Sequence, residues 1–352
     1  MKIIVDLGHP AHVHLFKNFI WEMERRGHEI LIIARDKEML LDLLDRYGFA
    51  YMNISKQGTS LPSLAWELLK RDYRLFFIAR SFRPDLLMGC SEIISHVGKI
   101  LRKPSVMFTD TEHATLSNWI AFPFASTICV PSCFKNDLGN KEIRYNGYHE
   151  LAYLHPDRFT PDTTVLNTLG LTPGEPYTIV RFVSWGASHD IGHHGIRDKV
   201  AFVKALEPYG HILISSEGPL PIELEKYRIR VPREKMHDLL YYATLYIGEG
   251  ATMASEAALL GTPSLFISSL VGTMGNFVEL EQKYELMYSY SDAGMALQKS
   301  LDILRDPHGK KIWAQKRERL LKDKIDVTAF MVRFIENYPQ SFIEMKHHQK
   351  NP

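Results

Sequence analysis

The stretch at residues 245–267, LYIGEGATMASEAALLGTPSLFI, constrains the fold more than any other part of the chain. Its apolar ends predict two short buried strands, and the small residues between them predict a helix that begins after two glycines. Glycines at such a turn let the backbone pass close to a ligand, and the first free N–H groups of the helix suit a phosphate. Glu256 lies about one turn into the helix, where a carboxylate reaches a ribose. The alternative is an ordinary βαβ unit whose glycines only make the turn and whose Glu256 is solvated.

Strand and helix patterns alternate along both halves of the chain. Strands are expected at 2–7, 30–34, 50–54, 85–89, 105–108, 127–130 and 143–145, and then at 177–183, 211–215, 245–247 and 264–267. Such alternation predicts an α/β fold with parallel, doubly wound sheets. Prolines and glycines between 156 and 176 predict an interdomain linker. We therefore expect Rossmann-like domains over 1–157 and 177–325, followed by a helix and tail over 326–352 placed to cross back to the first domain.

Charge and cysteine content exclude several classes of protein. The chain has 352 residues, with 42 Lys and Arg against 41 Asp and Glu, so it has no global field to hold nucleic acid. Its three cysteines are too few for a disulfide framework, which favours the reducing cytoplasm. No apolar run reaches the roughly 18 residues of a membrane span, and no export signal follows Met1.

Two Rossmann-like halves, the HV pair after the first strand and the segment EGATMASEAALLGTP resemble the GT-B superfamily of nucleotide-sugar enzymes. Within it, the chain is most similar to an uncharacterised prokaryotic family near the peptidoglycan N-acetylglucosaminyltransferase and the UDP-N-acetylglucosamine 2-epimerases. The resemblance implies two domains that face each other across a cleft. It also implies that Gly250, Ala251, Thr252 and Met253 hold a diphosphate and that Glu256 holds the ribose.

Two further segments match the nucleotide-binding parts of these relatives. Residues 183–189, VSWGASH, lie where the transferase has a diphosphate loop, and they offer Ser184, Gly186, Ala187 and Ser188 as donors, with Trp185 as a departure. Residues 231–240 match the stretch that recognises uracil, where the candidates are Val231, Met236 and His237.

The carboxylates favour transfer over epimerisation. The epimerases need acid and base groups on both faces of the sugar, but a matching Asp would fall at Cys90 and Ser91, and only Glu112 matches one of their carboxylates. An inverting transferase needs a single base to take the proton of the acceptor. His12, Asp110 and Glu112 follow strands of the first half and are the catalytic candidates, with His12 first.

Histidines gather after the first strand of each half. His9, His12 and His14 form one group, and His189, His193 and His194 form the other. Imidazoles there suit hydrogen bonds to a polar ligand, a metal ion, or a purely structural role. The first role is favoured, so we expect a nucleotide sugar as substrate with neither a metal nor another cofactor.

Aromatic runs at 75–78 and 119–124 are typical of core, with a docking patch for a membrane or a lipid-linked acceptor as the alternative. The sequence therefore predicts a cytoplasmic, inverting glycosyltransferase with a UDP-sugar donor. We expect its acceptor to be a saccharide or a lipid-linked saccharide in the synthesis of cell-surface polysaccharide or glycoconjugate. An epimerase is the second hypothesis, and a non-catalytic nucleotide-sugar-binding protein is the third.

Overall fold

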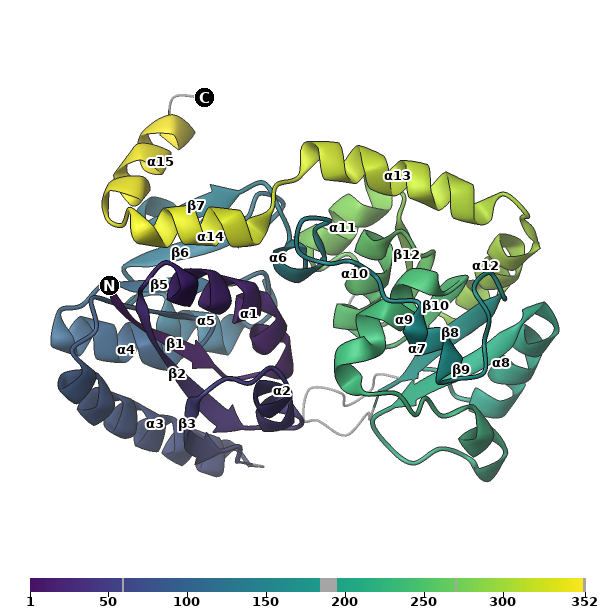
Figure 1. Ribbon diagram of the computed structural model, residues 1–352, viewed down its shortest axis with the longest axis horizontal. Helices are drawn as coiled ribbons and strands as arrows, with labels where there is room; N and C mark the ends of the chain where they lie inside the picture. The colour runs from purple at the N-terminus through teal and green to yellow at the C-terminus, as the bar shows by residue number, and fades with distance from the viewer. Residues whose placement is uncertain (59, 184–194, 270, 351–352) are drawn as a thin grey trace. The chain divides into compact units, whose positions relative to one another are not determined.

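The computed structural model describes residues 1–58, 60–183, 195–269 and 271–350, and the chain divides into two compact units. The N-terminal unit comprises Met1–Arg158 and Ile325–Pro352, and the C-terminal unit comprises Phe159–Lys324. Each unit holds one sheet whose strands all run parallel (Figure 1). The predicted α/β architecture of two Rossmann-like, doubly wound sheets is confirmed.

The sheet of the N-terminal unit has the strand order β3-β2-β1-β4-β5-β6-β7. Its strands are β1 (Lys2–Leu7), β2 (Glu29–Asp36), β3 (Tyr51–Lys56), β4 (Leu86–Gly89), β5 (Ser105–Phe108), β6 (Thr127–Pro131) and β7 (Glu142–Tyr145). The order reverses between β1 and β4, and in such sheets ligands bind beyond the carboxyl ends of the strands at this switch point.

Helices cover both faces of this sheet. One face packs against α1 (Pro10–Arg25), α2 (Leu40–Arg46), α6 (Leu151–Leu154) and α14 (Val327–Glu336). The other face packs against α3 (Leu61–Phe82), α4 (Glu92–Leu101) and α5 (Thr115–Ala121), whose inward residues Leu75, Val97 and Ala121 share a core with strand residues such as Ile4 and Met107. Two further elements complete this unit. They are the last helix, α15 (Gln340–Lys350), and a short 3₁₀ turn, η1 (Gly139–Lys141), between β6 and β7.

The apolar face of the first helix predicts a start only near Leu15, but α1 begins at Pro10, so His12 and His14 lie on a helix rather than in a loop. His9 is the N-cap, and its side chain accepts a hydrogen bond from the backbone N–H of Ala11. Pro10 follows at the first helical position, where its fixed φ and missing N–H are tolerated. The cap and the proline together explain the early start.

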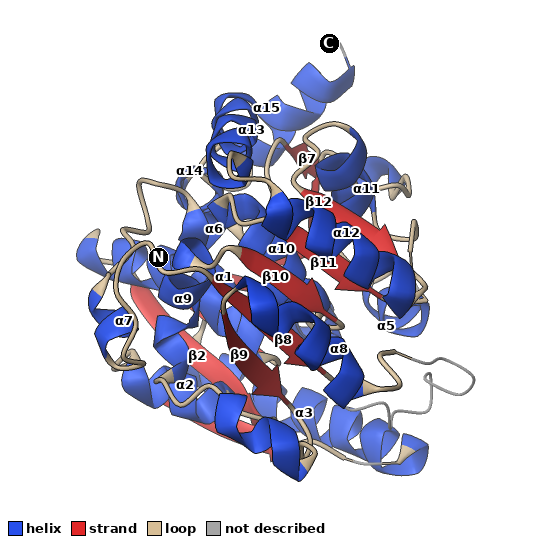
Figure 2. Ribbon diagram, turned by 90° about the vertical axis from the view of Figure 1, so that its right-hand side faces the viewer, coloured by secondary structure: helices blue, strands red, loops and turns tan. Residues whose placement is uncertain are grey.

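The sheet of the C-terminal unit has the order β12-β11-β10-β8-β9 (Figure 2). Its strands are β8 (Tyr177–Phe182), β9 (His211–Ser216), β10 (Leu245–Gly248), β11 (Ser264–Ile267) and β12 (Met287–Tyr290). Its helices are α7 (Thr164–Asn167), α8 (Lys199–Leu206), α9 (Met236–Tyr242), α10 (Ala251–Leu260), α11 (Gly275–Gln282), α12 (Ala293–Arg305) and α13 (Gly309–Asp323), with 3₁₀ turns η2 (Glu207–Tyr209), η3 (Ile222–Tyr227) and η4 (Arg233–Lys235). The order of this sheet reverses between β8 and β10, which marks its own switch point.

The chain returns to the N-terminal unit after α13. The helical pattern over about 312–338 predicts an interruption near Asp326, and the structure has two helices there, α13 and α14. Asp326 caps α14 by accepting a hydrogen bond from the N–H of Ala329. None of the helices in the described ranges combines the length and the apolarity needed to cross a bilayer.

Candidate functional site

A buried ionic group lies at the switch point of the N-terminal sheet. Asp6, at the end of β1, is fully buried and lies 3.3 Å from the guanidinium of Arg71, which reaches it from α3. The hydroxyl of Ser91, which precedes α4, donates to Asp6 and accepts from Arg71. Burial raises the pKa of Asp6, while Arg71 and Ser91 act in the opposite direction. The group ties β1, α3 and α4 together beneath the turn that leads into α1.

The backbones of β1 and β4 approach each other closely beside Asp6. Gly89 pairs with Asp6 in the sheet, and a Cβ at Gly89 would lie only 2.7 Å from the carbonyl oxygen of Asp6. Sequence reasoning missed Asp6 and Arg71, since one lies within an apolar strand and the other within an amphipathic helix. The only signal was the charged Asp6 directly after the apolar run Ile3–Val5.

His9 and His12 lie together at the start of α1, with ring centroids 5.9 Å apart. Nδ1 of His12 accepts a hydrogen bond of 3.2 Å from the backbone N–H of Gly8. A neutral imidazole with Nδ1 accepting carries its proton on Nε2, so Nε2 of His12 is a donor. Burial, and then the charges of His9 and His149, lower the pKa of His12 well below its usual range. His12 is therefore neutral at pH 7.

Asp110 lies after β5, beside His149, which follows β7. Nδ1 of His149 is 3.3 Å from Oδ2 of Asp110, and Nε2 of His149 is buried without a hydrogen-bond partner among the described residues. Burial lowers the pKa of His149, with Asp110 acting against it, so His149 is also neutral at pH 7. A carboxylate beside Nδ1 keeps the proton on that nitrogen and leaves the lone pair on Nε2, which is the tautomer that a general base needs.

His149 and its neighbour Tyr145 were not identified from the sequence. The two rings are parallel within 6°, with centroids 6.5 Å apart, so the phenol ring lies stacked beside the imidazole. Burial raises the pKa of Tyr145 well above its usual range, which leaves its phenol protonated. The available signal was the position of His149 just beyond a strand of the parallel sheet.

Glu112 and His14 lie apart from this arrangement. Glu112 is 8% exposed, and its carboxylate accepts a hydrogen bond from the backbone N–H of Lys135. His14 packs against the ring of Tyr153 at 5.4 Å, and its Nδ1 is 3.4 Å from the hydroxyl of Tyr47. The structure therefore groups His9 and His12, and separately Asp110 and His149, and gives Glu112 and His14 other contacts.

At the switch point of the C-terminal sheet, two glycines make room for an arginine. A Cβ at Gly248 would lie 2.5 Å from the carbonyl oxygen of Arg181, and a Cβ at Gly250 would lie 3.0 Å from its Cγ. The guanidinium of Arg181 then donates to Ser215 and to Glu217, each over 2.6 Å. The need for glycine at both positions thus arises from the close packing of β8 against the turn.

The turn nonetheless leaves the start of α10 open. Gly250 is the N-cap, and among the described residues no side chain caps this helix end. Thr252 is exposed, and Ala251 and Met253 are half-buried, so the first turn is accessible. The first N–H groups of a helix have no acceptor within the helix, and together with the helix dipole they favour an anion.

Glu256 lies further along α10 and pairs with a histidine. Its carboxylate is 3.0 Å from Nε2 of His237 on α9, and the two side chains are only 5% and 6% exposed. The ring of Phe159 packs edge-on against His237 with centroids 6.3 Å apart. Val231 and Met236, the other candidates of this segment, are half-buried just before and at the start of α9. The structure thus brings α9 and α10 together through a buried hydrogen bond.

Glu249, between the two glycines, is a polar residue that sequence reasoning did not identify. Its carboxylate is 6% exposed and accepts hydrogen bonds from the N–H groups of Val183 and Ile196, over 2.9 and 2.8 Å. The remaining candidates, Ser184, Gly186, Ala187, Ser188, His189 and His193, together with His194, lie outside the described residues. Glu249 therefore links Val183 and Ile196, which lie on either side of residues 184–194 in the sequence.

One group of potential metal ligands occurs within the described parts of the chain, formed by His155, Asp157 and Asp326. Nε of Arg158 lies 2.7 Å from Asp326, which also caps α14. A guanidinium at this distance already neutralises the carboxylate, so the group is explained by its contacts within the protein.

Comparisons with known proteins bear on both units. An uncharacterised protein of Methanocaldococcus jannaschii is 27% identical over 297 residues, which cover 80% of this chain and 86% of that protein. A UDP-N-acetylglucosamine–N-acetylmuramyl-(pentapeptide) pyrophosphoryl-undecaprenol N-acetylglucosamine transferase of Desulfotalea psychrophila is 28% identical over 130 residues, covering 32% of this chain and 35% of the transferase.

Solved structures match the fold over nearly the whole chain. The UDP-GlcNAc 2-epimerase from Neisseria meningitidis, bound to UDP-GlcNAc, has a TM-score of 0.67 at 11% identity, with coverage of 98% of this chain and 100% of the epimerase. Several glycosyltransferases match with TM-scores between 0.60 and 0.63. The resemblance to GT-B proteins is thus confirmed for the fold. The family model described as "Protein of unknown function (DUF354)" matches residues 1–338, and the chain belongs to that family.

Proposed function

We propose that this protein is an inverting glycosyltransferase that uses a nucleotide sugar, with UDP as the nucleotide. The observation that carries the proposal is the position of His149, whose Nδ1 lies 3.3 Å from Asp110 at the carboxyl edge of a parallel sheet and whose pKa burial lowers. A base of this kind takes a hydroxyl proton at neutral pH, and inverting transfer needs one such base.

The chemistry is a single displacement. The acceptor hydroxyl oxygen attacks the anomeric carbon and loses its proton to Nε2 of His149, while the bond from that carbon to the diphosphate oxygen breaks. Asp110 then stabilises the imidazolium that forms, and the Nε2–H of neutral His12 donates a hydrogen bond to a sugar or acceptor oxygen. His12 is thus proposed as a donor and His149 as the base.

The C-terminal unit is proposed to hold the donor. The accessible first turn of α10, at Gly250, Ala251, Thr252 and Met253, suits the leaving diphosphate. Glu256 is proposed to bind the ribose, Val231, Met236 and His237 the base, and the segment with Ser184, Gly186, Ala187 and Ser188 the remaining phosphate oxygens. Similar folds were solved with UDP-GlcNAc, UDP and thymidine diphosphate, which supports a nucleotide diphosphate ligand.

An epimerase is the second candidate, favoured by the similarity to UDP-GlcNAc 2-epimerases over nearly the full length of both chains. That reaction requires acid and base groups on both faces of the sugar. Ser91 replaces the carboxylate expected after β4 and donates to Asp6, and the matching Glu112 is buried against the backbone of Lys135. These contacts favour transfer, which we place in cytoplasmic synthesis of cell-surface polysaccharide or glycoconjugate.

The test begins with a thermal-shift screen over UDP-, GDP-, dTDP- and CMP-sugars, followed by mass spectrometry of products with saccharide and lipid-linked acceptors. Transfer predicts a new glycosidic product, whereas conversion of UDP-GlcNAc to its 2-epimer without an acceptor supports the second candidate. Binding of a nucleotide sugar with no product in any mixture supports a non-catalytic binding protein.

Two matched variants then identify the base. His149→Gln should lower kcat by about two to four orders of magnitude with donor affinity little changed. His12→Gln keeps a side-chain N–H donor and should cost less. Nitrogen NMR of the free protein gives an independent readout, with the proton expected on Nδ1 of His149 and on Nε2 of His12. The reverse pair of tautomers would contradict the assignment of the base.

A further inference from the structure

Helix α3 presents an apolar stripe on its outward side. Trp66, Leu69, Tyr73 and Phe77 are 59%, 60%, 67% and 50% exposed. Their spacing of three and four residues places them along one line of the helix surface. The rings of Tyr73 and Phe77 contact each other with centroids 4.8 Å apart. The opposite side of α3 packs on the sheet through Leu75 and Ala79, so the stripe is separate from the core.

The charges on α3 are sorted between its two sides. Both acidic residues face inward, where Glu67 bonds to Arg35 over 2.6 Å and Asp72 bonds to His96 over 2.9 Å. Lys70 and Arg80 are exposed beside the stripe, and the ammonium of Lys70 lies over the ring of Trp66 at 5.3 Å. The outward side of α3 is therefore aromatic and cationic, although the whole chain has a formal charge of only +1.

His96 links this helix to its neighbours. Its Nδ1 contacts Asp72 on α3, and its Nε2 lies 3.2 Å from the carbonyl oxygen of Ile120 on α5. The exposed apolar surface of α3 has a counterpart on α5, where Leu116 is 65% and Trp119 is 77% exposed.

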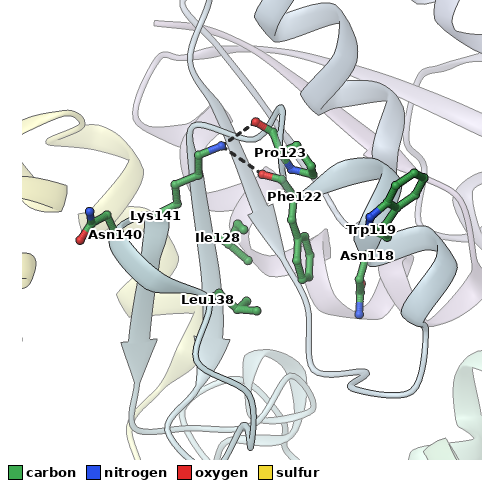
Figure 3. A pocket seen from close by; sticks show the side chains of 8 residues that line it. All are labelled: Asn118, Trp119, Phe122, Pro123, Ile128, Leu138, Asn140 and Lys141. Carbon is green, nitrogen blue, oxygen red and sulfur yellow. Dashed lines mark hydrogen bonds between the residues drawn. The ribbon is translucent and has the colours of Figure 1, made fainter.

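Beside α5 lies a pocket of about 440 Å³, whose apolar lining residues are Trp119, Phe122, Pro123, Ile128 and Leu138 (Figure 3). The ammonium of Lys141 donates to the carbonyl oxygens of Phe122 and Pro123 at its edge, over 3.1 and 2.7 Å, as the dashed lines show. The pocket thus adds recessed apolar surface to the exposed aromatic side chains.

We infer that the outward side of α3 docks on the surface of an anionic lipid bilayer. Trp and Tyr rings partition into the headgroup region, and nearby Lys and Arg side chains are attracted to anionic lipids. A second copy of the same side would bring like charges together, which disfavours self-association through this stripe. The inference concerns the placement of the protein and does not require transferase activity.

The experiment is co-sedimentation of the full chain with vesicles of phosphatidylcholine alone, or of phosphatidylcholine and phosphatidylglycerol in equal parts. The wild-type protein should bind the anionic vesicles, bind the neutral ones far less, and dissociate as salt is raised. Lys70→Gln with Arg80→Gln should weaken binding to anionic vesicles by about 25-fold, because each cation near such a surface contributes about fivefold. Trp66→Ser with Phe77→Ser should weaken it as well.

Ile222→Ser with Met295→Ser is the matched control, since both residues are exposed apolar side chains of the C-terminal unit. The control should bind as the wild type does, and the melting temperature of every variant should stay close to that of the wild type. Equal binding to both vesicle types, or equal loss in the control, would overturn the inference. So would light scattering that shows a dimer abolished by Trp66→Ser with Phe77→Ser in a protein that does not bind vesicles.

Discussion

Replacing Glu256 by alanine tests the proposed donor site and the buried contact on which it depends. The side chain of Glu256 is 5% exposed and pairs with His237 over 3.0 Å, so Glu256→Ala removes this buried hydrogen bond at Nε2 of His237. Loss of a hydrogen bond to a charged group lowers the free energy of unfolding by about 1.5 to 3 kcal/mol. For a domain the size of the C-terminal unit, that loss lowers the melting temperature by about 3 to 12 °C.

The same change should weaken nucleotide binding. If the carboxylate of Glu256 accepts hydrogen bonds from the ribose hydroxyls, their loss raises the Kd for UDP by about 10- to 100-fold. Glu256→Gln keeps an oxygen that can accept from His237 but removes the charge. The Glu256→Gln protein should therefore keep much of the stability of the wild type and still bind UDP more weakly. Scanning calorimetry measures the first quantity and isothermal titration calorimetry measures the second.

Asp238→Ala is the matched control, because Asp238 is a buried carboxylate of the same unit, next to His237, that accepts a hydrogen bond of 2.8 Å from the N–H of Asp162. It should lower the melting temperature and leave the Kd for UDP unchanged. A Glu256→Ala protein that is less stable but binds UDP as the wild type does would refute the ribose assignment. A variant with unchanged stability would refute the buried contact itself.

Three further predictions concern the groups that support the two sites. Glu249→Gln leaves one acceptor oxygen for two N–H groups, so hydrogen exchange should accelerate at only one of the amides of residues 183 and 196. In denaturant titrations the same change should lower the unfolding free energy by about 1 to 3 kcal/mol. Arg71→Met leaves Asp6 buried beside Ser91 but without its cation, and it should cost about 3 to 5 kcal/mol of unfolding free energy. Adding Asp6→Asn should recover part of that loss, and no recovery would show that Asp6 is neutral before the change. The hydrogen bond of His96 to the carboxylate of Asp72 raises the pKa of His96. This pair therefore stabilises the fold fully below the pKa of His96 in the unfolded chain, and the stabilisation is lost as pH rises through the higher pKa of the folded state. The difference in unfolding free energy between the wild type and His96→Asn should shrink as pH rises from 6 to 8, and a constant difference would contradict this prediction.

Apart from β12, which was not predicted from the sequence, the strands of both sheets were predictable because their physical cause is local. Strands buried on both faces are largely apolar, and the apolar residues within 2–7 and 264–267 carry that signal within a few residues. Parallel pairing then requires crossover helices, which the alternating patterns supply. The start of α1 was predicted too late even though its cause is also local, because a histidine cap followed by Pro10 is a weaker signal than the apolar face that begins at Leu15.

The ionic contacts were not predictable, because their partners are brought together only by the fold. Arg71 reaches Asp6 from 65 residues away, and the two lie in segments that read as an ordinary helix and an ordinary strand. Glu249 follows a strand directly, and its two N–H donors flank a separate segment of the chain. Residue type and spacing place a charged group near an edge of a sheet, but the partner that fixes its protonation and direction lies elsewhere in the sequence.

The two histidines show why this matters for mechanism. His12 and His149 are both neutral and both lie beyond strands of the same sheet, so composition and position do not distinguish their roles. The distinction arises from what each Nδ1 contacts: a backbone N–H makes Nδ1 of His12 an acceptor, whereas a carboxylate beside Nδ1 of His149 keeps a proton there. A base requires the lone pair on the nitrogen that takes the proton, and only the second arrangement leaves it on Nε2. The assignment of the base therefore follows from the group that lies beside Nδ1 of each imidazole, which is why the tautomers are a more direct test of the mechanism than the loss of activity alone.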